Sequence, residues 1–386
     1  MTPVPEARDR ILICRSNPVA PDPRVAKAAA ALAAAGYPVQ VICWDRTGAL
    51  PLEQTLASNE GISITRLPLA ASYASGIGNL PALLRWQWRL LLRQLKERRN
   101  YDIIHACDFD TMLPALVLKA ISGKKVVYDV FDFYADHLRK TPGFIKSVIR
   151  RLDYWAINRV DAVILADENR KEQIRGTRPR HLAIIYNTPE EPKIKLEESH
   201  NKSAFSIAYI GLLQVERGLL ELLNVMGKHP EWTLTLAGFG GDEERLGKES
   251  AKLENVTWRG RIPYEEALRV SAEADVLIAT YDPKIPNHKY ASPNKLFEAM
   301  MLAKPIIVAR GTNMDVIVER WNMGLVMDYG DVTALERAIA ALANDNALRK
   351  TLEQNARRAY ETEYNWNIMK QRLLDLYEKV ASGVQG

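Results

Sequence analysis

Short runs of β-branched and aliphatic residues alternate with stretches of helical periodicity along almost the whole chain. Such runs are typical of buried strands, and strands separated by helices form parallel sheets that are covered on both faces. The pattern therefore predicts an α/β protein. We expect strands at 11–14, 39–44, 62–65, 102–107, 125–130, 162–166, 182–186, 206–211, 232–238, 256–260, 274–281, 305–310 and 324–329. Helical patterns lie between most of them, for example at 25–35, where Gly36 ends the helix, and at 80–98.

The segment 187–203 is polar, contains prolines and has no apolar period, so we interpret it as a linker. With 386 residues, the chain is long enough for two domains. We therefore expect two doubly wound, Rossmann-like domains that face each other across a cleft, one over residues 1–190 and one over residues 204–364. The helix predicted at 365–380 is amphipathic and need not belong to the nearer domain. Ligands are expected in the loops that follow the carboxyl ends of the strands.

The composition excludes several classes of protein. Hydrophobic residues make up 47% and charged residues 26% of the chain, which excludes a disordered polymer. The three cysteines are far apart and lie in apolar runs, so they predict neither a disulfide framework nor a metal site and fit a reducing cytosol. No apolar run approaches the roughly 18 residues of a membrane span, and the run at 11–14 is too short for a signal-peptide core. We expect a cytoplasmic protein, either soluble or peripheral on the inner face of the membrane.

Basic residues are concentrated in the N-terminal half of the chain, where residues 1–200 carry a net charge of +7, against −2 for the remainder. They gather in two predicted amphipathic helices, at 85–99 and 139–159, each with one acidic residue. The stripe of the first helix that is predicted to face the core consists of Leu84, Trp88, Leu91, Leu92 and Leu95. Trp86 and Leu90 then lie outside it, among arginines. We hypothesise that this face and the helix at 139–159 contact an anionic membrane, and the alternative is a solvated basic face.

Residues 292–298, Ser-Pro-Asn-Lys-Leu-Phe-Glu, are the stretch most informative for chemistry. Serine is a preferred N-cap and proline favours the first helical position, so we predict that Ser292 begins a helix. The free amides of a helix N-terminus bind anions, and a cation there, Lys295, is unfavourable unless a bound anion offsets it. Glu298 lies one turn deeper on the same face, where a carboxylate can accept hydrogen bonds from sugar hydroxyls. The stretch predicts a phosphate site, and the alternative is a solvated lysine and glutamate on a surface helix.

A second candidate anion site follows the strand predicted at 206–211. Gly211 lets the backbone approach a ligand closely, and Arg217, just before Gly218 and the next helix, can bind two phosphate oxygens. The glycines at 238–241 lack the spacing of a dinucleotide-binding fingerprint, so we interpret them as a tight turn.

Polar residues also follow strands in the N-terminal half. His105 lies in the strand predicted at 102–107, and a hydrogen-bonded structural role competes with a catalytic one. Asp108 and Asp110 match a DxD pattern that binds metals in some enzymes, but capping of the next helix is the alternative, and we expect no metal. Asp22 and Arg24 follow the first strand and can bind hydroxyl groups, with helix capping by Asp22 as the alternative.

The order of the motifs resembles the retaining GT-B glycosyltransferases of family four, over nearly the whole chain. In the C-terminal half the motifs are GLLQVERG at 211–218, LAGFGG at 236–241, NVTWRGRIP at 255–263, ADVLIATY at 274–281 and SPNKLFEAMMLAKPIIVA at 292–309. In the N-terminal half they are DPRVAKAAAALAAAGYPVQVICW at 22–44 and YDIIHACDFDTMLPA at 101–115. The resemblance implies the GT-B fold and transfer of a sugar from a nucleotide sugar to a glycan or lipid-linked acceptor, in the synthesis of surface polysaccharide or glycoconjugate. It implies no cofactor, no metal and no nucleic acid.

The resemblance also implies roles for the two domains and for single residues. The N-terminal domain is expected to bind the acceptor and to pack against helix 365–380, and the C-terminal domain is expected to bind the donor. Arg217 and Lys295 are expected to hold the donor diphosphate, with Glu298 at the ribose and Gly211 beside the transferred sugar. The full expected donor-binding set is Gly211, Arg217, Arg261, Ser292, Asn294, Lys295, Leu296 and Glu298. The expected catalytic residues are His105, Asp132, Arg217 and Lys295, and the expected acceptor-binding residues are Asp22, Arg24 and Asp108.

Three positions depart from the pattern of that family. Tyr290 stands where the family usually has the first of two glutamates, the second being Glu298. Leu212 replaces an arginine that many members have, and Phe131 replaces a histidine, so that Asp132 is the nearest polar neighbour. These departures keep two alternatives open: a non-catalytic GT-B scaffold that binds glycan or a partner transferase, and a sugar-nucleotide epimerase.

Overall fold

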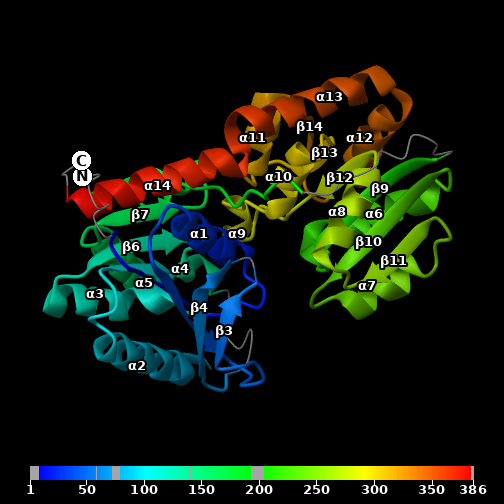
Figure 1. Cartoon of the computed structure of the whole chain (residues 1–386). Helices are drawn as coiled ribbons and strands as arrows, with labels where there is room; N and C mark the ends of the chain where they lie inside the picture. Colours follow the sequence, from blue (N-terminus) through cyan, green and yellow to red (C-terminus); the bar gives the residue numbers. More distant parts are fainter. Residues whose placement is uncertain (1–7, 58, 72–78, 139–140, 193–203, 384–386) are drawn as a thin grey trace. The chain divides into compact units, whose positions relative to one another are not determined.

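The computed structural model describes residues 8–57, 59–71, 79–138, 141–192 and 204–383. Contacts divide the chain into two compact units, with residues 1–186 and 369–386 in unit 1 and residues 187–368 in unit 2. Each unit is built on one twisted sheet with helices packed against it (Figure 1). The boundary lies at the beginning of the segment interpreted as a linker, of which residues 193–203 lie outside the described residues.

Unit 1 contains a sheet of eight strands in the order β3-β4-β2-β1-β5-β6-β7-β8. The strands are β1 (Ile11–Arg15), β2 (Val39–Asp45), β3 (Glu53–Leu56), β4 (Asn59–Pro68), β5 (Ile103–Cys107), β6 (Lys125–Val130), β7 (Ala162–Leu165) and β8 (Leu182–Ile184). All neighbours are parallel except β3 and β4, which are antiparallel. The sheet is therefore parallel, as expected, apart from the antiparallel strand at this edge. The sequence of β3, Glu-Gln-Thr-Leu, is polar because an edge strand needs no apolar partner on both faces.

The helices of unit 1 cover both faces of this sheet. They are α1 (Pro23–Ala34), α2 (Leu80–Lys96), α3 (Phe109–Ser122), α4 (Tyr134–His137) and α5 (Gly143–Ile157), with a 3-10 turn at Glu168–Glu172. The chain moves in opposite directions along the sheet from β1 to β2 and from β5 to β7. Because such crossovers are right-handed, α1 covers one face, and α3 and α5 cover the other, where α2 packs beside α3.

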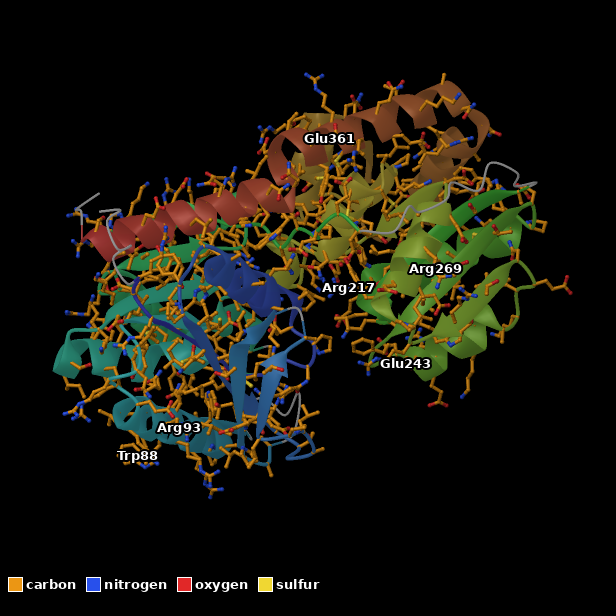
Figure 2. The ribbon with its side chains drawn as sticks, in the orientation of Figure 1. Trp88, Arg93, Arg217, Glu243, Arg269 and Glu361 are labelled. Atoms are coloured by element: carbon orange, nitrogen blue, oxygen red, sulfur yellow. The ribbon has the colours of Figure 1, made fainter. Side chains whose placement is uncertain are left out.

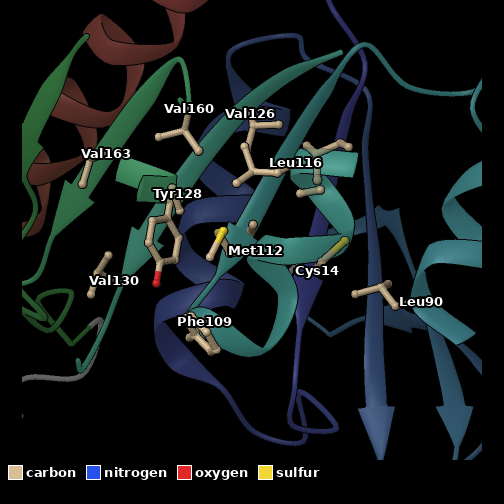
Figure 3. Packing of buried hydrophobic residues seen from close by; sticks show 14 of the residues in the cluster. Cys14, Leu90, Phe109, Met112, Leu116, Val126, Tyr128, Val130, Val160 and Val163 are labelled. Carbon is tan, nitrogen blue, oxygen red and sulfur yellow. The ribbon is translucent and has the colours of Figure 1, made fainter. Parts of the chain in front are cut away.

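The core of unit 1 lies between the sheet and helices α2, α3 and α5. Figure 3 shows part of it, with Phe109, Met112 and Leu116 of α3 packed near Tyr128 of β6. These side chains are buried, and their spacing along α3 is that of one helix face. Burial of such a cluster supplies the main favourable term in folding of the unit.

The observed burial of α2 is the reverse of the predicted one. Trp86 and Leu90 are completely buried, and Trp86 stacks on Trp44 of β2 with ring centroids 5.3 Å apart. Leu84 is 57% and Trp88 61% exposed. Leu92 is exposed as well, and only Leu91 and Leu95 of the predicted stripe pack against the core. The prediction was wrong because α2 is apolar on two sides, so that pairing with Trp44 decides which side faces inward.

The last helix, α14 (Trp366–Ser382), begins in unit 2, and from Met369 onward it belongs to unit 1. There the hydroxyl of Tyr377 lies 2.7 Å from Nδ1 of His105, and the Lys125 ammonium donates to the carbonyl of Ala381. The end of the chain thus packs on the N-terminal unit, as the amphipathic pattern at 365–380 allowed.

Unit 2 contains a parallel sheet of six strands in the order β11-β10-β9-β12-β13-β14. The strands are β9 (Phe205–Leu212), β10 (Trp232–Phe239), β11 (Val256–Gly260), β12 (Val276–Ala279), β13 (Ile306–Ala309) and β14 (Gly324–Met327). The helices are α6 (Leu219–Lys228), α7 (Glu243–Ser250), α8 (Tyr264–Glu273), α9 (Pro286–Lys289), α10 (Asn294–Met301), α11 (Met314–Trp321), α12 (Val332–Asn344) and α13 (Asn346–Ala359), followed by a π-helical turn at Tyr360–Tyr364. The strand order reverses direction between β9 and β12, which places a switch point there.

The structure also bears on the predictions about a membrane span and about the basic helix at 139–159. Among the described residues, no helix combines the length and apolar character that crossing a membrane requires. The basic helix predicted at 139–159 is α5, which begins at Gly143, and residues 139–140 lie outside the described part of the chain.

Candidate functional site

The carboxyl ends of β9 and β12 meet at the switch point of unit 2. The loop after β9 carries Arg217 in a 3-10 turn and leads through Gly218 into α6. The segment after β12 carries Tyr281 and leads to α10, whose second residue is Lys295. Open α/β sheets bind ligands at such switch points, because the loops on either side diverge and leave the strand ends open.

Glycines allow the strand ends to approach one another. A Cβ atom at Gly238 of β10 would overlap the carbonyl oxygen of Gly211 on β9, so no larger residue fits there. A Cβ atom at Gly211 would lie 3.0 Å from Nζ of Lys295 and 3.3 Å from its Cε. Gly211 therefore leaves room for the end of the Lys295 side chain, which packs directly against it. Gly238 lies in β10, and the turn that was predicted at 238–241 follows the strand, where the Gly240 amide donates to Glu243.

Lys295 is the most unusual group at this edge. Its Nζ is buried and has no hydrogen-bond partner among the described residues. It lies 3.6 Å from the centroid of the Tyr209 ring and 5.6 Å from that of Tyr281. Burial, together with the neighbouring charge of Arg217, holds the pKa of Lys295 well below its ordinary value of 10.5. A buried ammonium without an anionic partner is costly, so this arrangement is suited to an anion that completes it.

Arg217 supplies a second cation at the same place. Its guanidinium carbon lies 3.7 Å from the centroid of the Tyr281 ring, and its Nε is buried without a hydrogen-bond partner among the described residues. The carbonyl of Arg217 accepts a hydrogen bond from the Thr280 hydroxyl at 3.0 Å, which fixes the turn to the end of β12. The turn also needs Gly218, with φ +70°, because a side chain there would overlap Thr280.

Helix α10 begins slightly later than the sequence predicts. Its first residue is Asn294, and the N-cap is Pro293, with no side-chain hydrogen bond to the cap, so the prediction that Ser292 caps the helix is wrong. Pro293 itself has extended backbone, with ψ 146°, so it lies outside the helix and the first helical residue is the next one. Asn294 is hydrogen-bonded to Asn187. The side chain of Leu296 is fully buried in the core, so the expected contact with the donor is not one that this side chain can make.

Glu298 and Arg261 lie near exposed aromatic rings of unit 2. A carboxylate oxygen of Glu298 accepts a hydrogen bond from the hydroxyl of Tyr264 at 3.0 Å. The Arg261 guanidinium lies 4.8 Å from the centroid of the Phe239 ring, at the end of β10. Tyr264 and Phe239 are both about half exposed. Their ring faces are large apolar surfaces beside charged groups, an arrangement that suits a flat, polar ligand.

The polar residues predicted in the N-terminal half are largely bonded to one another. Asp22 caps α1 through the amide of Val25 and accepts from Arg15 at 2.9 Å, and Arg15 also pairs with Asp108. The side chain of Asp22 is nearly inaccessible. Asp22 therefore performs the capping role that was the alternative to acceptor binding.

Arg24 and His105 belong to a second buried network. The Arg24 guanidinium pairs with Asp129 at 2.7 Å and donates to the carbonyl of Ile185. His105 is 1% exposed, with Nδ1 against the Tyr377 hydroxyl and Nε2 3.4 Å from Asp129. The expectations of acceptor binding by Arg24 and of direct catalysis by His105 disagree with this structure, because both side chains are enclosed and their polar atoms are occupied.

Asp108 and Asp132 lie at the end of the sheet of unit 1. Asp108 does not cap α3 with its side chain but accepts from the amide of Phe131 at 2.8 Å, and burial raises its pKa to about 6. Asp132 pairs with Arg170 at 2.6 Å and keeps 42% of its side chain exposed. Asp110 is buried, and the described residues hold no cluster of three or more side chains suited to a metal ion.

The three positions that depart from the family pattern are placed as follows. Phe131 lies under two guanidinium groups, those of Arg15 at 4.1 Å and Arg24 at 4.7 Å. Leu212 is 40% exposed at the end of β9, and the ring of Tyr290 lies 5.3 Å from Nζ of Lys289. At each position an apolar or aromatic side chain stands in place of a polar one.

The sequence did not reveal that two tyrosine rings lie beside Lys295. Tyr209 and Tyr281 lie in predicted strands, where tyrosine is read as a strand former, and nothing in the pattern showed their rings beside Lys295. It also missed Asp129 and Tyr377, which are 248 residues apart in the chain and both contact His105. Only the position of Asp129 near the end of a predicted strand was a usable signal.

Two family models match adjacent parts of the chain. The model described as Glycosyl transferase 4-like domain matches residues 20–188, and the model described as Glycosyl transferases group 1 matches residues 190–359. A curated relative, the capsular polysaccharide biosynthesis glycosyltransferase CapM of Staphylococcus aureus, is 24% identical over 207 residues, which are 50% of this chain and 51% of CapM. The chain thus spans about half the length of that relative.

Solved structures cover nearly the whole chain. Sucrose-phosphate synthase from Thermosynechococcus elongatus has a TM-score of 0.78 and 18% identity, covering 97% of this chain and 100% of the other. Anabaena HepE in complex with UDP-glucose has a TM-score of 0.72 and 16% identity, covering 96% and 100%. These likenesses establish the fold. Because the two family models together account for most of residues 20–359, the chain belongs to the glycosyltransferases and has the GT-B fold.

Proposed function

We propose that the chain transfers a sugar from a nucleotide sugar to an acceptor hydroxyl group, and that unit 2 binds the donor. The observation that carries this proposal is the buried, unpartnered ammonium of Lys295 beside Arg217, at the N-terminus of α10. Two cations and free helix amides provide what a diphosphate needs. The UDP-glucose in the HepE structure, which shares the fold, supports a nucleotide sugar as the donor.

In the proposed reaction the bond between the anomeric carbon and the diphosphate oxygen breaks, and the acceptor oxygen forms a bond to the same carbon. The acceptor proton passes to an oxygen of the departing diphosphate. Lys295 and Arg217 stabilise the negative charge that develops on that group. The rings of Tyr209 and Tyr281 beside them lower the local dielectric constant, which strengthens this electrostatic interaction. We infer that the acceptor attacks from the face that the diphosphate leaves, so that the configuration is retained. The reaction is accelerated by the positioning of donor and acceptor and by electrostatic stabilisation of the leaving group, without a covalent nucleophile.

Glu298 is the proposed partner of the donor ribose. Its carboxylate lies one turn further along α10 from Lys295, and one oxygen already accepts from Tyr264. A carboxylate can accept more than one hydrogen bond, so a ribose hydroxyl can join the Tyr264 hydroxyl. Arg261 and the ring of Phe239 lie at the end of β10 and are proposed to contact the nucleoside.

The acceptor is proposed to bind to unit 1. Of the candidate residues there, Asp132 keeps the largest exposed fraction of its side chain, while Asp22 and Arg24 hold the local structure. CapM, which acts in capsular polysaccharide synthesis, supports a growing glycan as the acceptor.

A thermal-shift screen of the full chain with UDP-, GDP- and ADP-sugars tests donor binding, because a ligand that binds only the folded state raises the melting temperature. One nucleotide series should raise the melting temperature of the wild type and of Lys289→Ala, an exposed lysine just before α10, but not of Lys295→Ala. Equal shifts for Lys289→Ala and Lys295→Ala contradict the proposed site.

A second candidate function is a non-catalytic scaffold that binds a glycan or a partner transferase. The observation in its favour is that the departures at Leu212, Tyr290 and Phe131 each remove a polar group. Release of nucleoside diphosphate by the purified protein, with or without acceptor, separates the two functions. A scaffold releases none above the blank.

A further inference from the structure

The outer sides of α2, α3 and α5 carry most of the exposed large hydrophobic side chains in the described part of the chain. Fifteen such side chains are exposed among the described residues, and ten of them belong to these three helices. They are Leu80, Leu84, Trp88 and Leu92 of α2, Val117 and Ile121 of α3, and Phe144, Val148, Leu152 and Trp155 of α5. Scattered exposed hydrophobics are ordinary, but a concentration on neighbouring elements marks an interaction surface.

These ten side chains form a surface because the three helices are neighbours on the same face of the sheet in unit 1. Helix α3 packs against α2 on one side and against α5 on the other. On α2 the exposed hydrophobics recur every four residues, which is one stripe along the helix. The opposite stripe, with Trp86 and Leu90, is in the core, so the exposed stripe has no partner among the described residues of unit 1. Figure 2 shows Trp88 on the side of α2 that points away from the sheet. We refer to this surface as the apolar-basic face.

Exposed charges on the apolar-basic face are basic. Arg85, Arg89 and Lys96 are exposed on α2, and Arg150 and Arg151 are exposed on α5. Arg85, Lys96 and Arg151 have no ion-pair partner in the described part of the chain, whereas Arg150 pairs with Asp136, before α5. The same three helices carry few acidic residues. Helix α2 has none, and Asp110 of α3 and Asp153 of α5 are both buried.

We propose that the apolar-basic face docks on an anionic lipid bilayer. Apolar and aromatic side chains enter the headgroup region, and the arginines and lysines around them are attracted to negatively charged headgroups. A second copy of the chain fits less well, because two such faces would bring unpaired guanidinium groups together. The inference depends on unit 1 alone and not on the donor chemistry proposed for unit 2.

Flotation of the full chain with lipid vesicles tests this proposal. The wild type should float with vesicles of phosphatidylglycerol and phosphatidylcholine, less in high salt, and far less with phosphatidylcholine alone. Arg85→Glu with Arg151→Glu should bind more than about tenfold more weakly, since each basic residue near the surface contributes to attraction. The matched control is Arg269→Glu with Arg337→Glu, which changes the net charge equally on exposed positions of unit 2 and should float like the wild type.

A second pair of substitutions tests how much the apolar side chains contribute to vesicle binding. Trp88→Ser with Phe144→Ser keeps every charge and should weaken vesicle binding at low salt, while Val316→Ser, an exposed valine of unit 2, should not. Wild-type protein that stays below the vesicles, or charge-reversed protein that floats equally well, overturns the proposal. So does a wild-type dimer that Trp88→Ser with Phe144→Ser converts to monomer without any change in lipid binding, because the face would then bind a second copy.

Discussion

At the scale of single residues, Lys295 stands out because its ammonium is buried without a hydrogen-bond partner among the described residues. It lies between aromatic rings, beside Arg217 and against Gly211, and Glu298 is the acidic group that acts on it. A group of this kind lowers the stability of the ligand-free protein and strengthens binding of an anion. Stability and function are therefore expected to change in opposite directions when Lys295 is replaced.

Replacement of Lys295 by methionine tests that opposition. Lys295→Met keeps the length of the side chain and removes the buried charge, so the ligand-free protein should unfold at a higher temperature. Sugar transfer should fall by about a hundredfold, as when one group that stabilises transition-state charge is removed. Differential scanning calorimetry and initial rates measure the two effects. A lower melting temperature together with unchanged transfer contradicts the account, and Lys289→Met serves as the control.

The lowered pKa of Lys295 makes donor binding dependent on pH. Burial and Arg217 lower the pKa of Lys295 in the free protein, and a bound diphosphate raises the pKa again by supplying negative charge. At a pH between the two pKa values, donor binding therefore takes up a proton, and the apparent affinity falls as the pH rises. Calorimetric titrations in two buffers with different ionisation enthalpies should give different binding heats for the wild type. For Lys295→Met the heats should agree once other groups are accounted for.

Gly211 and Gly238 face each other across β9 and β10, yet they are expected to respond differently to alanine. At Gly211 the added methyl group meets the flexible end of Lys295, and φ of +152° strains any residue with a side chain, so the free energy of unfolding should fall by about 1 to 3 kcal/mol while donor affinity falls about tenfold. At Gly238 the methyl group meets backbone atoms, and the free energy of unfolding should fall by at least about 3 kcal/mol. Urea unfolding and nucleotide titration separate the two effects, and equal losses of stability would show that the contacts of Gly211 are misjudged.

At the scale of elements, α2 shows that tertiary pairing decides which side of an amphipathic helix is buried. The helix is apolar on two sides, and the stacking of Trp86 on Trp44 selects one of them. Truncation should reveal the difference directly. Trp86→Ala should lower the free energy of unfolding by about 3 to 5 kcal/mol, whereas Trp88→Ala should change it by less than about 0.5 kcal/mol. Similar values for the two variants would contradict the observed burial.

At this scale, too, some strands and site residues could be predicted from the sequence and others could not. All thirteen predicted strands are present, because a run of buried apolar residues is a local property. The short polar strand β3 was missed, since its pairing with β4 gives no apolar signal. Gly211, Arg217 and Lys295 could be singled out because they follow strand ends or begin a helix. The ion pairs of Arg24 with Asp129 and of Arg15 with Asp108 join residues more than 90 positions apart, and no local pattern shows that they are occupied.

At the scale of the whole molecule, the two units present different kinds of polar and charged groups. Unit 2 presents cations at the switch point of a parallel sheet, and unit 1 holds its polar residues in internal ion pairs and exposes a basic, apolar helix face. We propose that unit 2 binds the donor and that unit 1 binds the acceptor and a lipid surface. The proposal requires that a diphosphate binds to the ammonium of Lys295.

A crystal structure of the full chain with a nucleotide sugar tests that claim most directly. Diphosphate oxygens are expected within hydrogen-bond distance of Lys295 Nζ and of the Arg217 guanidinium, close to Gly211. A nucleotide sugar bound elsewhere, with the Lys295 ammonium still over the ring of Tyr209 and without an anionic neighbour, would contradict it.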